Sequence, residues 1–294
     1  MRKVVHAARR APIVAAAESG GQLQIWDLET SQLLSEFATV FDGCNRLAVS
    51  SAGDLVVTAN WRKGKKAGVA CYETANGKLI WHRTDLGQIQ HMTFSAQGDR
   101  IWCEIDSRPV HCLDSKSGST LKIWRAVQDV IDSPSHTLAV RKQQVLIEGE
   151  KSVSVPRLTR SGLEAALGPD CACICEAWNP TIRPVPTTEA LVRCIDCETG
   201  IERWRYRPPS DHFIGLISDQ DDGSFCAIQT GCEGNKWIVA LIRLSAEDGT
   251  PILIRSLEAP PPYFGGFGDG IFVTPHGEVI SLKTGENTKK LDFK

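Results

Sequence analysis

One short pattern recurs six times along the chain: an apolar run, an acidic or hydroxyl residue, a turn that ends in glycine, and a second apolar run. The glycine, replaced by serine in the first copy, lies at Ser31, Gly77, Gly118, Gly200, Gly249 and Gly285. These positions are 46, 41, 82, 49 and 36 residues apart, and 82 is twice 41. We therefore infer that a seventh copy has lost its signature between Gly118 and Gly200.

The period of this pattern constrains the fold. Seven units in 294 residues average 42 residues each, and a β-rich repeat of roughly 40–50 residues is typical of propeller blades. Turn residues divide the third unit into expected strands at 90–95, 100–105, 110–114 and 121–127. The sequence therefore predicts an all-β, seven-bladed propeller with four-stranded antiparallel blades, built as one domain over residues 1–294.

Three parts of the chain depart from the regular repeat. The fourth blade, at about 128–164, lacks the turn signature, and Ser161–Leu167 is expected to form a short helix there. In the fifth blade, prolines at 180, 184 and 186 favour an extended loop over Asn179–Ala190. The first expected strand, Lys3–Ala7, either begins the first blade or pairs with the last one.

Composition limits the environment and the partners. The formal net charge of −2 gives no overall attraction to nucleic acids or acidic membranes. Nowhere do 18 apolar residues follow one another, and the apolar stretch near the N-terminus is too short for a signal peptide. The 11 cysteines fit a reducing compartment better than a disulfide framework. We expect a soluble cytoplasmic protein with no membrane contact.

Two blades carry a recognisable repeat motif. The segment from Cys194 to Trp204 resembles the A-x-D-x-x-T-G-x-x-x-W repeat of quinoprotein (PQQ-like) propellers, with cysteine in place of alanine. The segment from Cys71 to Trp81 is similar to it more loosely. In the first blade, Ile25-Trp26-Asp27 resembles the Trp-Asp end of a WD40 strand.

These resemblances imply an architectural role for the repeat. They imply that Trp81, Trp124 and Trp204 pack as core residues and hold the blades together. Quinoprotein enzymes bind a quinone and calcium at the propeller axis, usually with eight blades, an export signal and often an adjacent pair of cysteines. This sequence has seven units and no Cys-Cys step. We therefore expect no cofactor, no resident metal and no catalytic residue, and the WD40 resemblance implies a rigid platform for partners.

The most unusual local feature of the sequence is a cluster of cysteines. Alternation along a strand places Cys171, Cys173 and Cys175 on one face, and the next strand carries Cys194 and Cys197. A zinc or redox site is one reading. Packing of small buried residues is the other, because Cys194 and Cys197 would point to opposite faces of a regular strand.

The loops carry the candidate binding residues. In a propeller, the connections from strand two to strand three and from one blade to the next emerge on the same face. The residues that we expect to bind a partner there are Trp61, Arg62, Lys63, Lys65, Lys66, Arg108, Asn179, Arg183, His212, Lys236 and Tyr263.

Trp61 is the leading candidate among them. An aromatic side chain among flexible cations is typical of a binding hot spot. The alternatives are that Trp61 folds back onto its own blade, or that it stacks on a base of a nucleic acid. One cationic loop on a slightly acidic chain argues against nucleic acid.

The sequence thus favours a non-catalytic, protein-binding propeller. It would act as an interaction platform or as the specific neutralising partner of one protein, as immunity proteins do. The alternative is a quinoprotein-like or sugar-active enzyme with a site at the axis. A cluster of carboxylates with Asn or Arg around the axis would favour that alternative.

Overall fold

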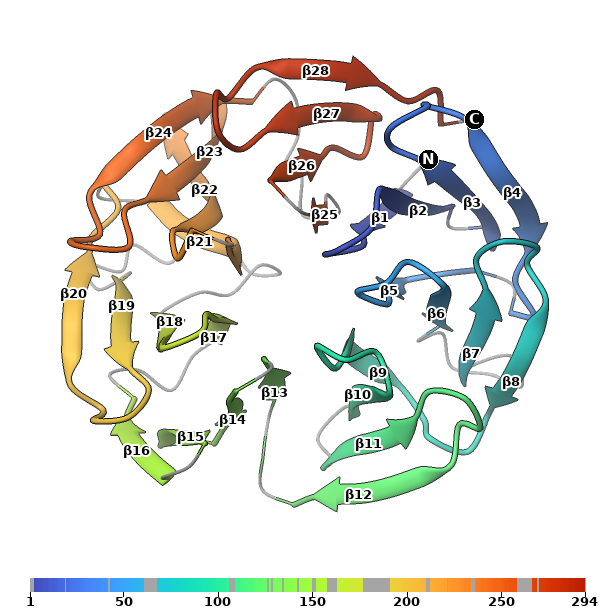
Figure 1. Ribbon diagram of the computed structural model, residues 1–294, viewed down its shortest axis with the longest axis horizontal. Helices are drawn as coiled ribbons and strands as arrows, with labels where there is room; N and C mark the ends of the chain where they lie inside the picture. Colours follow the sequence, from blue (N-terminus) through green and yellow to red (C-terminus); the bar gives the residue numbers. More distant parts are fainter. Residues whose placement is uncertain are drawn as a thin grey trace. The chain divides into compact units, whose positions relative to one another are not determined.

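The computed structural model is all-β and contains seven four-stranded antiparallel sheets, the blades of a propeller. It describes residues 3–18, 20–41, 43–60, 68–105, 109–125, 127, 129–133, 135–141, 143–149, 152–157, 163–176, 191–209, 212–220, 222–233, 236–257, 266–268 and 270–293. Figure 1 shows the strands of each blade side by side in chain order. In this part of the chain, no helix has the length and apolar character needed to span a membrane.

Each blade is formed by four consecutive strands. Blade 1 contains β1 (Lys3–Ala7), β2 (Ile13–Glu18), β3 (Gln22–Asp27) and β4 (Leu33–Ala38). Blade 2 contains β5 (Arg46–Val49), β6 (Leu55–Asn60), β7 (Gly68–Glu73) and β8 (Leu79–Arg83). Blade 3 contains β9 (Ile89–Phe94), β10 (Arg100–Ile105), β11 (Val110–Asp114) and β12 (Thr120–Trp124). Blade 4 contains β13 (Asp129–Asp132), β14 (Thr137–Val140), β15 (Gln144–Glu148) and β16 (Ser152–Pro156).

The last three blades follow the same order. Blade 5 contains β17 (Leu163–Leu167), β18 (Cys171–Glu176), β19 (Leu191–Asp196) and β20 (Glu202–Tyr206). Blade 6 contains β21 (His212–Asp219), β22 (Phe225–Glu233), β23 (Lys236–Leu244) and β24 (Pro251–Ser256). Blade 7 contains β25 (Gly266–Gly268), β26 (Ile271–Val273), β27 (Glu278–Ser281) and β28 (Asn287–Lys290). The expected seven four-stranded blades are confirmed.

The described residues form two compact units. One contains blades 1, 2, 3 and 7, and within it the first strands of neighbouring blades contact one another. The other contains blades 4, 5 and 6 together with the turn 282–285 of blade 7. In both units the core lies between blades: Ile101 and Cys103 of blade 3 pack on Trp81 of blade 2, and Phe225 of blade 6 packs with Cys194 of blade 5.

The structure resolves the place of the first strand. Strand β1 pairs with β2 and so belongs to blade 1, while blade 7 is complete in itself. Blade 7 nevertheless packs against blade 1: Val273 and Leu291 share a buried cluster with Val5 and Ala7. The first and last blades are therefore joined by side-chain packing and not by a strand that both share.

One sequence expectation is wrong. Leu163–Leu167, expected within a short helix, is strand β17 and pairs antiparallel with β18 from Leu163↔Glu176 to Leu167↔Ala172. A five-residue apolar segment has too few turns for helical periodicity to decide its state, and pairing with a buried neighbour does. The range expected for blade 4, about 128–164, contains all four of its strands and also the start of β17.

The recurring turn joins the third and fourth strands of its blade. Its glycines have positive φ values, such as 69° at Gly77 and 72° at Gly200, and Ser31 has a φ of 58°. Among the described residues, Ser31 is the only non-glycine with positive φ. Only glycine adopts this left-handed conformation without cost, so the backbone explains why the same residue recurs.

Candidate functional site

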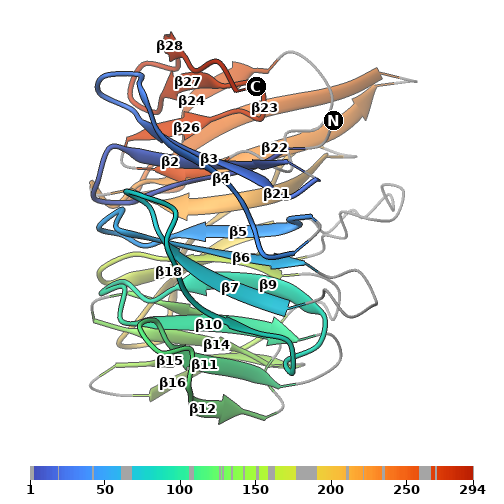
Figure 2. The ribbon, with the colours of Figure 1, turned by 90° about the vertical axis from the view of Figure 1, so that its right-hand side faces the viewer.

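The two ends of each blade are built differently. At one end, which we call the turn end, turns join the first strand to the second and the third to the fourth. At the other, the loop end, the second strand leads to the third and the fourth leads to the next blade. Figure 2 shows this for blade 2, whose strands β5, β6 and β7 run across the picture with the turn end on the left.

The turn end is fixed by hydrogen bonds within each turn. In blade 5, the Asp196 carboxylate accepts from the backbone N–H of Glu198 (3.1 Å) and of Thr199 (2.8 Å), and Asp27 and Asp114 make equivalent bonds in their turns. These bonds satisfy amides that the tight turn leaves without backbone partners. In these three blades the acidic residue of the repeat therefore accepts hydrogen bonds from its own turn.

A second set of bonds joins the turn ends of neighbouring blades. In five junctions, a side chain of one blade donates to the carbonyl three residues before the Gly or Ser that ends the next blade's turn. The pairs are Lys289 with Leu28, Ser35 with Thr74, Trp81 with Ser115, Trp204 with Ala246, and Arg243 with Leu282. Different donors use one acceptor position, so the backbone geometry, rather than the side-chain type, is what repeats.

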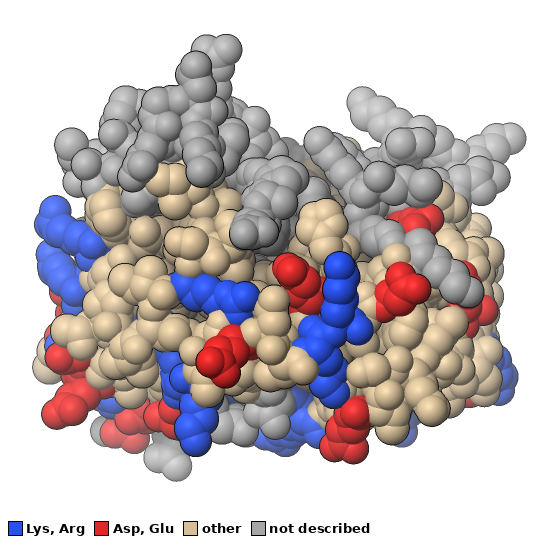
Figure 3. Space-filling view, turned by 90° about the horizontal axis from the view of Figure 1, so that it is seen from above, with Lys and Arg blue, Asp and Glu red and all other residues tan. Residues whose placement is uncertain are grey.

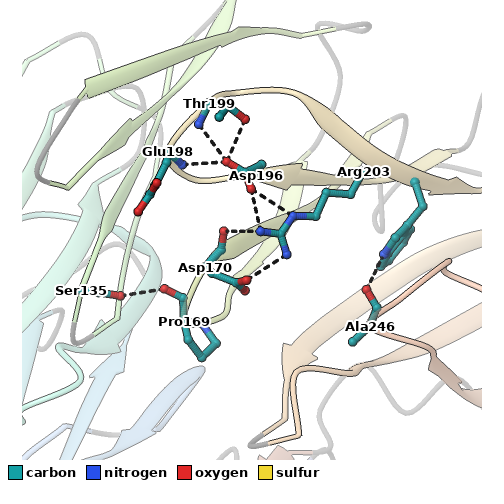
Figure 4. Close-up of polar contacts among 9 residues, drawn as sticks. Ser135, Pro169, Asp170, Asp196, Glu198, Thr199, Arg203 and Ala246 are labelled. Carbon is teal, nitrogen blue, oxygen red and sulfur yellow. Dashed lines mark hydrogen bonds and ion pairs between the residues drawn. The ribbon is translucent and has the colours of Figure 1, made fainter.

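Arg203 ties the two turns of blade 5 together (Figure 4). Its guanidinium contacts the carboxylates of Asp196 at 2.6 Å and Asp170 at 2.9 Å. The hydrogen bonds from Arg203 and Thr199 hold the pKa of the Asp196 carboxyl well below its usual range. The next residue, Trp204, donates its indole N–H to the Ala246 carbonyl of blade 6 at 2.9 Å.

The loop end is irregular. Its strand-two-to-three connections are 61–67 in blade 2, 106–109 in blade 3, 177–190 in blade 5 and 234–235 in blade 6, and the short segments 19–21, 141–143 and 274–277 in blades 1, 4 and 7. Its blade-to-blade connections include 207–211 and 257–265. Lengths therefore differ widely at this end, whereas the third-to-fourth-strand turns keep nearly one length.

Described residues frame the cationic loop 61–67 of blade 2. Asn60, which ends β6 and is buried, accepts a hydrogen bond at 3.0 Å from the Asn45 side chain. Gly68 begins β7, and a Cβ there would lie 2.1 Å from the Arg83 carbonyl oxygen. Arg46 donates to the Gln90 carbonyl of blade 3. Both strands that flank this loop are thus held by close contacts with residues of the same blade.

A buried ion pair marks the base of the longest connection, 177–190. Glu176 ends β18 with no exposed surface, and the Arg193 guanidinium lies 3.1 Å from its carboxylate. Arg193 also donates at 2.9 Å to the Pro156 carbonyl of blade 4. A buried pair is costly to break because removing one partner leaves the other charge desolvated, so it fixes where this connection begins.

Of the residues that the sequence predicts to bind a partner, the structure describes only two. Trp61, Arg62, Lys63, Lys65, Lys66, Arg108, Asn179, Arg183 and Tyr263 lie outside the described residues. For His212 and Lys236 the backbone alone is described: they begin β21 and β23, at the same loop end of blade 6. Their role stays a prediction.

Sequence reasoning missed the groups that support these loops. Arg193 lies inside the apolar run of β19, and Glu176 ends the apolar run of β18. A charged residue within or at the end of a buried strand was the available signal, because such charges are rarely buried unless paired. Only the register between β18 and β19 shows that these two meet.

The innermost strand of blade 1 contains a perturbed histidine. The Nδ1 atom of His6 accepts the Val49 backbone N–H at 3.2 Å, which leaves Nε2 as the protonated nitrogen. Desolvation and the nearby His91 lower the pKa of His6 to about 4. The described inner strands β1, β5, β9 and β25 of this unit include no Asp or Glu.

The cysteines of blade 5 are buried among apolar side chains on both faces of the sheet. Cys171, Cys173, Cys175 and Cys194 share one buried cluster, while Cys197 lies in another cluster on the opposite face, as alternation predicted. Within the described residues, no group of three or more His, Cys, Asp or Glu is arranged to hold a metal ion. The ten cysteines whose side chains are described are buried, and none of them is in a disulfide.

Surface charge is mixed on the side of the molecule in Figure 3. Lys and Arg alternate with Asp and Glu there, and the coloured residues in this view form no large area of one sign. This distribution agrees with the near-neutral net charge of −2.

Comparison with known proteins identifies the fold of this chain and gives no evidence about its activity. No protein-family profile matches the sequence, and no curated protein resembles it in sequence. The structure is similar to the WD40 repeats of RRP9 (TM-score 0.68, 10% identity, 92% of this chain and 85% of that one). It is also similar to the β-propeller domain of Cps50 (Swd1) from Myceliophteria thermophila (TM-score 0.65, 12% identity, 96% and 94%).

The PQQ-like resemblance is supported as well. The structure is similar to BamB from Moraxella catarrhalis, a PQQ-like propeller, with a TM-score of 0.56 and 11% identity over 94% of this chain and 79% of that one. At these identities the similarity establishes a propeller fold shared with WD40 and PQQ-like proteins.

Proposed function

We propose that this propeller binds a protein partner through the loop ends of its blades and does so without catalysis. The observation that carries the proposal is the contrast between the two ends. Turn-end polar groups are engaged in bonds within and between blades, whereas the loop end combines connections of unequal length with rigid supports. Variable loops on a rigid scaffold are the usual way in which a fold carries recognition.

The loop-end sequences suit a protein partner. Connection 61–67 contains Trp61 with Arg62, Lys63, Lys65 and Lys66. Aromatic and arginine residues are enriched among interface hot spots, and cations steer encounter with acidic surfaces. The general tendency of WD40 propellers to act as interaction scaffolds supports the same proposal.

The finer proposal is a single dedicated partner. Loop lengths differ widely among the blades, which suits one specific surface better than many. A neutralising protein that caps one toxin or enzyme would use such a surface. We further propose a cytoplasmic location. The ten buried cysteines whose side chains are described support it, because none is in a disulfide and a reducing compartment keeps thiols reduced.

A pair of matched variants tests the site. We expect the Trp61→Ala, Lys63→Ala double variant to lose the protein that co-purifies with the wild-type chain from its native cells. Because both residues lie in a loop-end connection, the melting temperature should stay unchanged. The control is Lys116→Ala, which removes an exposed cation from the turn end of blade 3. Loss of binding in the control, or binding kept by the double variant, would contradict the proposed face.

The captured protein also tests the finer proposal. One stoichiometric partner whose activity falls when the propeller is added would support neutralisation. Several unrelated partners at the same face would instead indicate a general platform.

A further inference from the structure

Three arginines are linked by hydrogen bonds at the loop end of blades 4 and 5. Arg141 directly follows β14, Arg157 directly follows β16, and Arg193 lies near the start of β19. The Arg157 guanidinium donates to the Arg141 carbonyl at 3.1 Å, and its backbone N–H donates to the Gln143 carbonyl at 3.0 Å. Arg193 donates at 2.9 Å to the carbonyl of Pro156, the residue before Arg157. Backbone carbonyls thus hold two of these guanidinium groups beside the third residue.

The carboxylates of this network do not balance its arginines. Arg193 lies 3.1 Å from the Glu176 carboxylate and 3.9 Å from that of Glu202. Glu202 also pairs with Arg205 at 2.5 Å. Burial lowers the pKa of Arg157, and the nearby Glu176 carboxylate raises it, so Glu176 acts on two guanidinium groups. Within this network two carboxylates therefore face three guanidinium groups, before Arg141 is counted.

Arg141 adds a guanidinium group with unused hydrogen-bonding capacity. Among the described residues, none accepts a hydrogen bond from its Nε, although that atom is buried, and the same holds for the Nε of Arg193. A buried donor without an acceptor costs free energy. The Arg141 side chain as a whole is only half-buried, so an acceptor outside the fold can still approach it.

The sequence of the adjoining loop-end connections adds more positive charge. Residues 141–143, 157–162 and 177–190 together contain five Lys or Arg and one Glu. The whole chain, in contrast, has a formal net charge of −2. The excess of positive charge is therefore local to this end of blades 4 and 5, and it favours an anionic group supplied by another molecule.

We propose that Arg141 and Arg157 bind the carboxylate of an Asp or Glu side chain on the protein partner. This inference rests on the proposed function and adds a chemical requirement for the partner, an acidic residue at its centre of contact with blades 4 and 5. Guanidinium groups suit this role because they bind a carboxylate through two parallel hydrogen bonds. The buried pair of Arg193 and Glu176 supports the site from below.

An acidic protein side chain fits these observations better than a phosphate-rich surface. Nucleic acids and acidic membranes are bound by extended areas of positive charge. A chain of net charge −2 offers no such overall field, whereas a small group of half-buried guanidinium groups matches one carboxylate.

A labelled hexaglutamate peptide tests the site without knowledge of the partner. Fluorescence anisotropy at low ionic strength should show binding to the wild-type protein, and Arg141→Gln should weaken it about tenfold. Arg141→Lys should lose part of the affinity, because lysine keeps the charge and loses the paired hydrogen bonds. The matched control is Arg100→Gln, an exposed arginine at the turn end of blade 3, which should bind as the wild type does.

The protein captured from native cells gives a second readout. Arg141→Glu should lose this partner with no change in melting temperature or circular dichroism. Replacing one acidic residue of the partner with arginine should weaken its binding to the wild type and restore its binding to Arg141→Glu. Arg157 is less suitable for substitution because its hydrogen bonds hold the backbone of blade 4.

Two outcomes with the peptide would overturn this inference: no binding to the wild-type protein, or binding that Arg141→Gln leaves unchanged. Binding to vesicles of phosphatidylcholine and phosphatidylserine, with none to the peptide, would overturn it in favour of a lipid surface. If Trp61→Ala, Lys63→Ala loses the native partner while Arg141→Glu keeps it, this inference fails and the proposed function stands. If all these variants keep the partner, both fail.

Discussion

At the scale of single residues, the glycine that ends each turn meets two demands at once. Gly118 has a φ of 68°, and a Cβ there would lie 2.6 Å from the Trp81 ring of the preceding blade. We expect Gly118→Ala to lower the free energy of unfolding by about 2–4 kcal/mol, combining backbone strain with displacement of the indole. Denaturant unfolding measures this change.

Gly270 is the matched control for that prediction. Its φ is 58°, but a Cβ there would meet nothing within 4 Å. Gly270→Ala should therefore cost only the backbone strain, about 1 kcal/mol. Equal losses in the two variants would show that the Trp81 contact contributes nothing.

Ser31 offers the reverse experiment. It holds a φ of 58° where the other copies of the turn have glycine. Replacing it with glycine removes the strain but increases the freedom of the unfolded chain, so we expect a net gain of about 0.5 kcal/mol. A loss of stability in the same unfolding assay would contradict this account.

His6 gives a dependence on pH. Its pKa falls from 6.5 in the unfolded chain to about 4 in the fold, so the folded state favours the neutral ring. The stability this contributes is fully present above pH 6.5 and is lost as pH falls towards 4, by about 1–3 kcal/mol. Unfolding curves across this range should show the loss in the wild type and in the exposed-site control His276→Gln, and a smaller loss in His6→Gln.

At the scale of elements, the tryptophans in the fourth strands of three blades differ in role. Trp81 and Trp204 lie four residues after their glycines, are buried, and donate to the next blade. Trp124 lies six residues after Gly118 and packs edge-on against Trp102 of its own blade, with ring centroids 6.2 Å apart. The expectation that all three hold blades together is therefore met by Trp81 and Trp204, while the contact described for Trp124 is within its blade.

This difference is testable. Trp204→Leu loses the Ala246 hydrogen bond and the cover over Gly249, so we expect it to cost about 3–4 kcal/mol of stability. Trp124→Leu should cost less, since that ring remains partly exposed. Denaturant unfolding measures both losses. If the two variants have equal m-values, the midpoint of Trp204→Leu should be lower than that of Trp124→Leu, and the reverse order would contradict the prediction.

Strands were well predicted where both of their ends carry turn signals. The expected strands at 100–105 and 110–114 match β10 and β11, because alternating side chains and flanking turns both mark them. Leu163–Leu167 is followed by the turn residues Gly168-Pro169-Asp170, but its side chains do not alternate between apolar and polar, and its state depends on pairing with β18. A local pattern cannot supply that information.

At the scale of the whole molecule, the single-domain expectation stays a prediction. If all 294 residues unfold cooperatively, near-ultraviolet and far-ultraviolet signals should give one coincident transition. Gly118→Ala in one unit and Gly249→Ala in the other should then shift that same transition. Two transitions, each shifted by only one variant, would show that the units unfold independently.

The repeat in the sequence was sufficient to determine the seven blades, their order and the turn glycines, because the spacing of left-handed turns is a local property of the backbone. It also indicated which connections share the loop end, since antiparallel order fixes that from strand count alone. Only the tertiary structure decided which side chains meet: the pairing of Glu176 with Arg193, the contact of Trp204 with Gly249, and the position of Cys194 opposite Cys173. Each of these contacts depends on strand register or on the packing of one blade against the next, and neither is encoded within a single repeat.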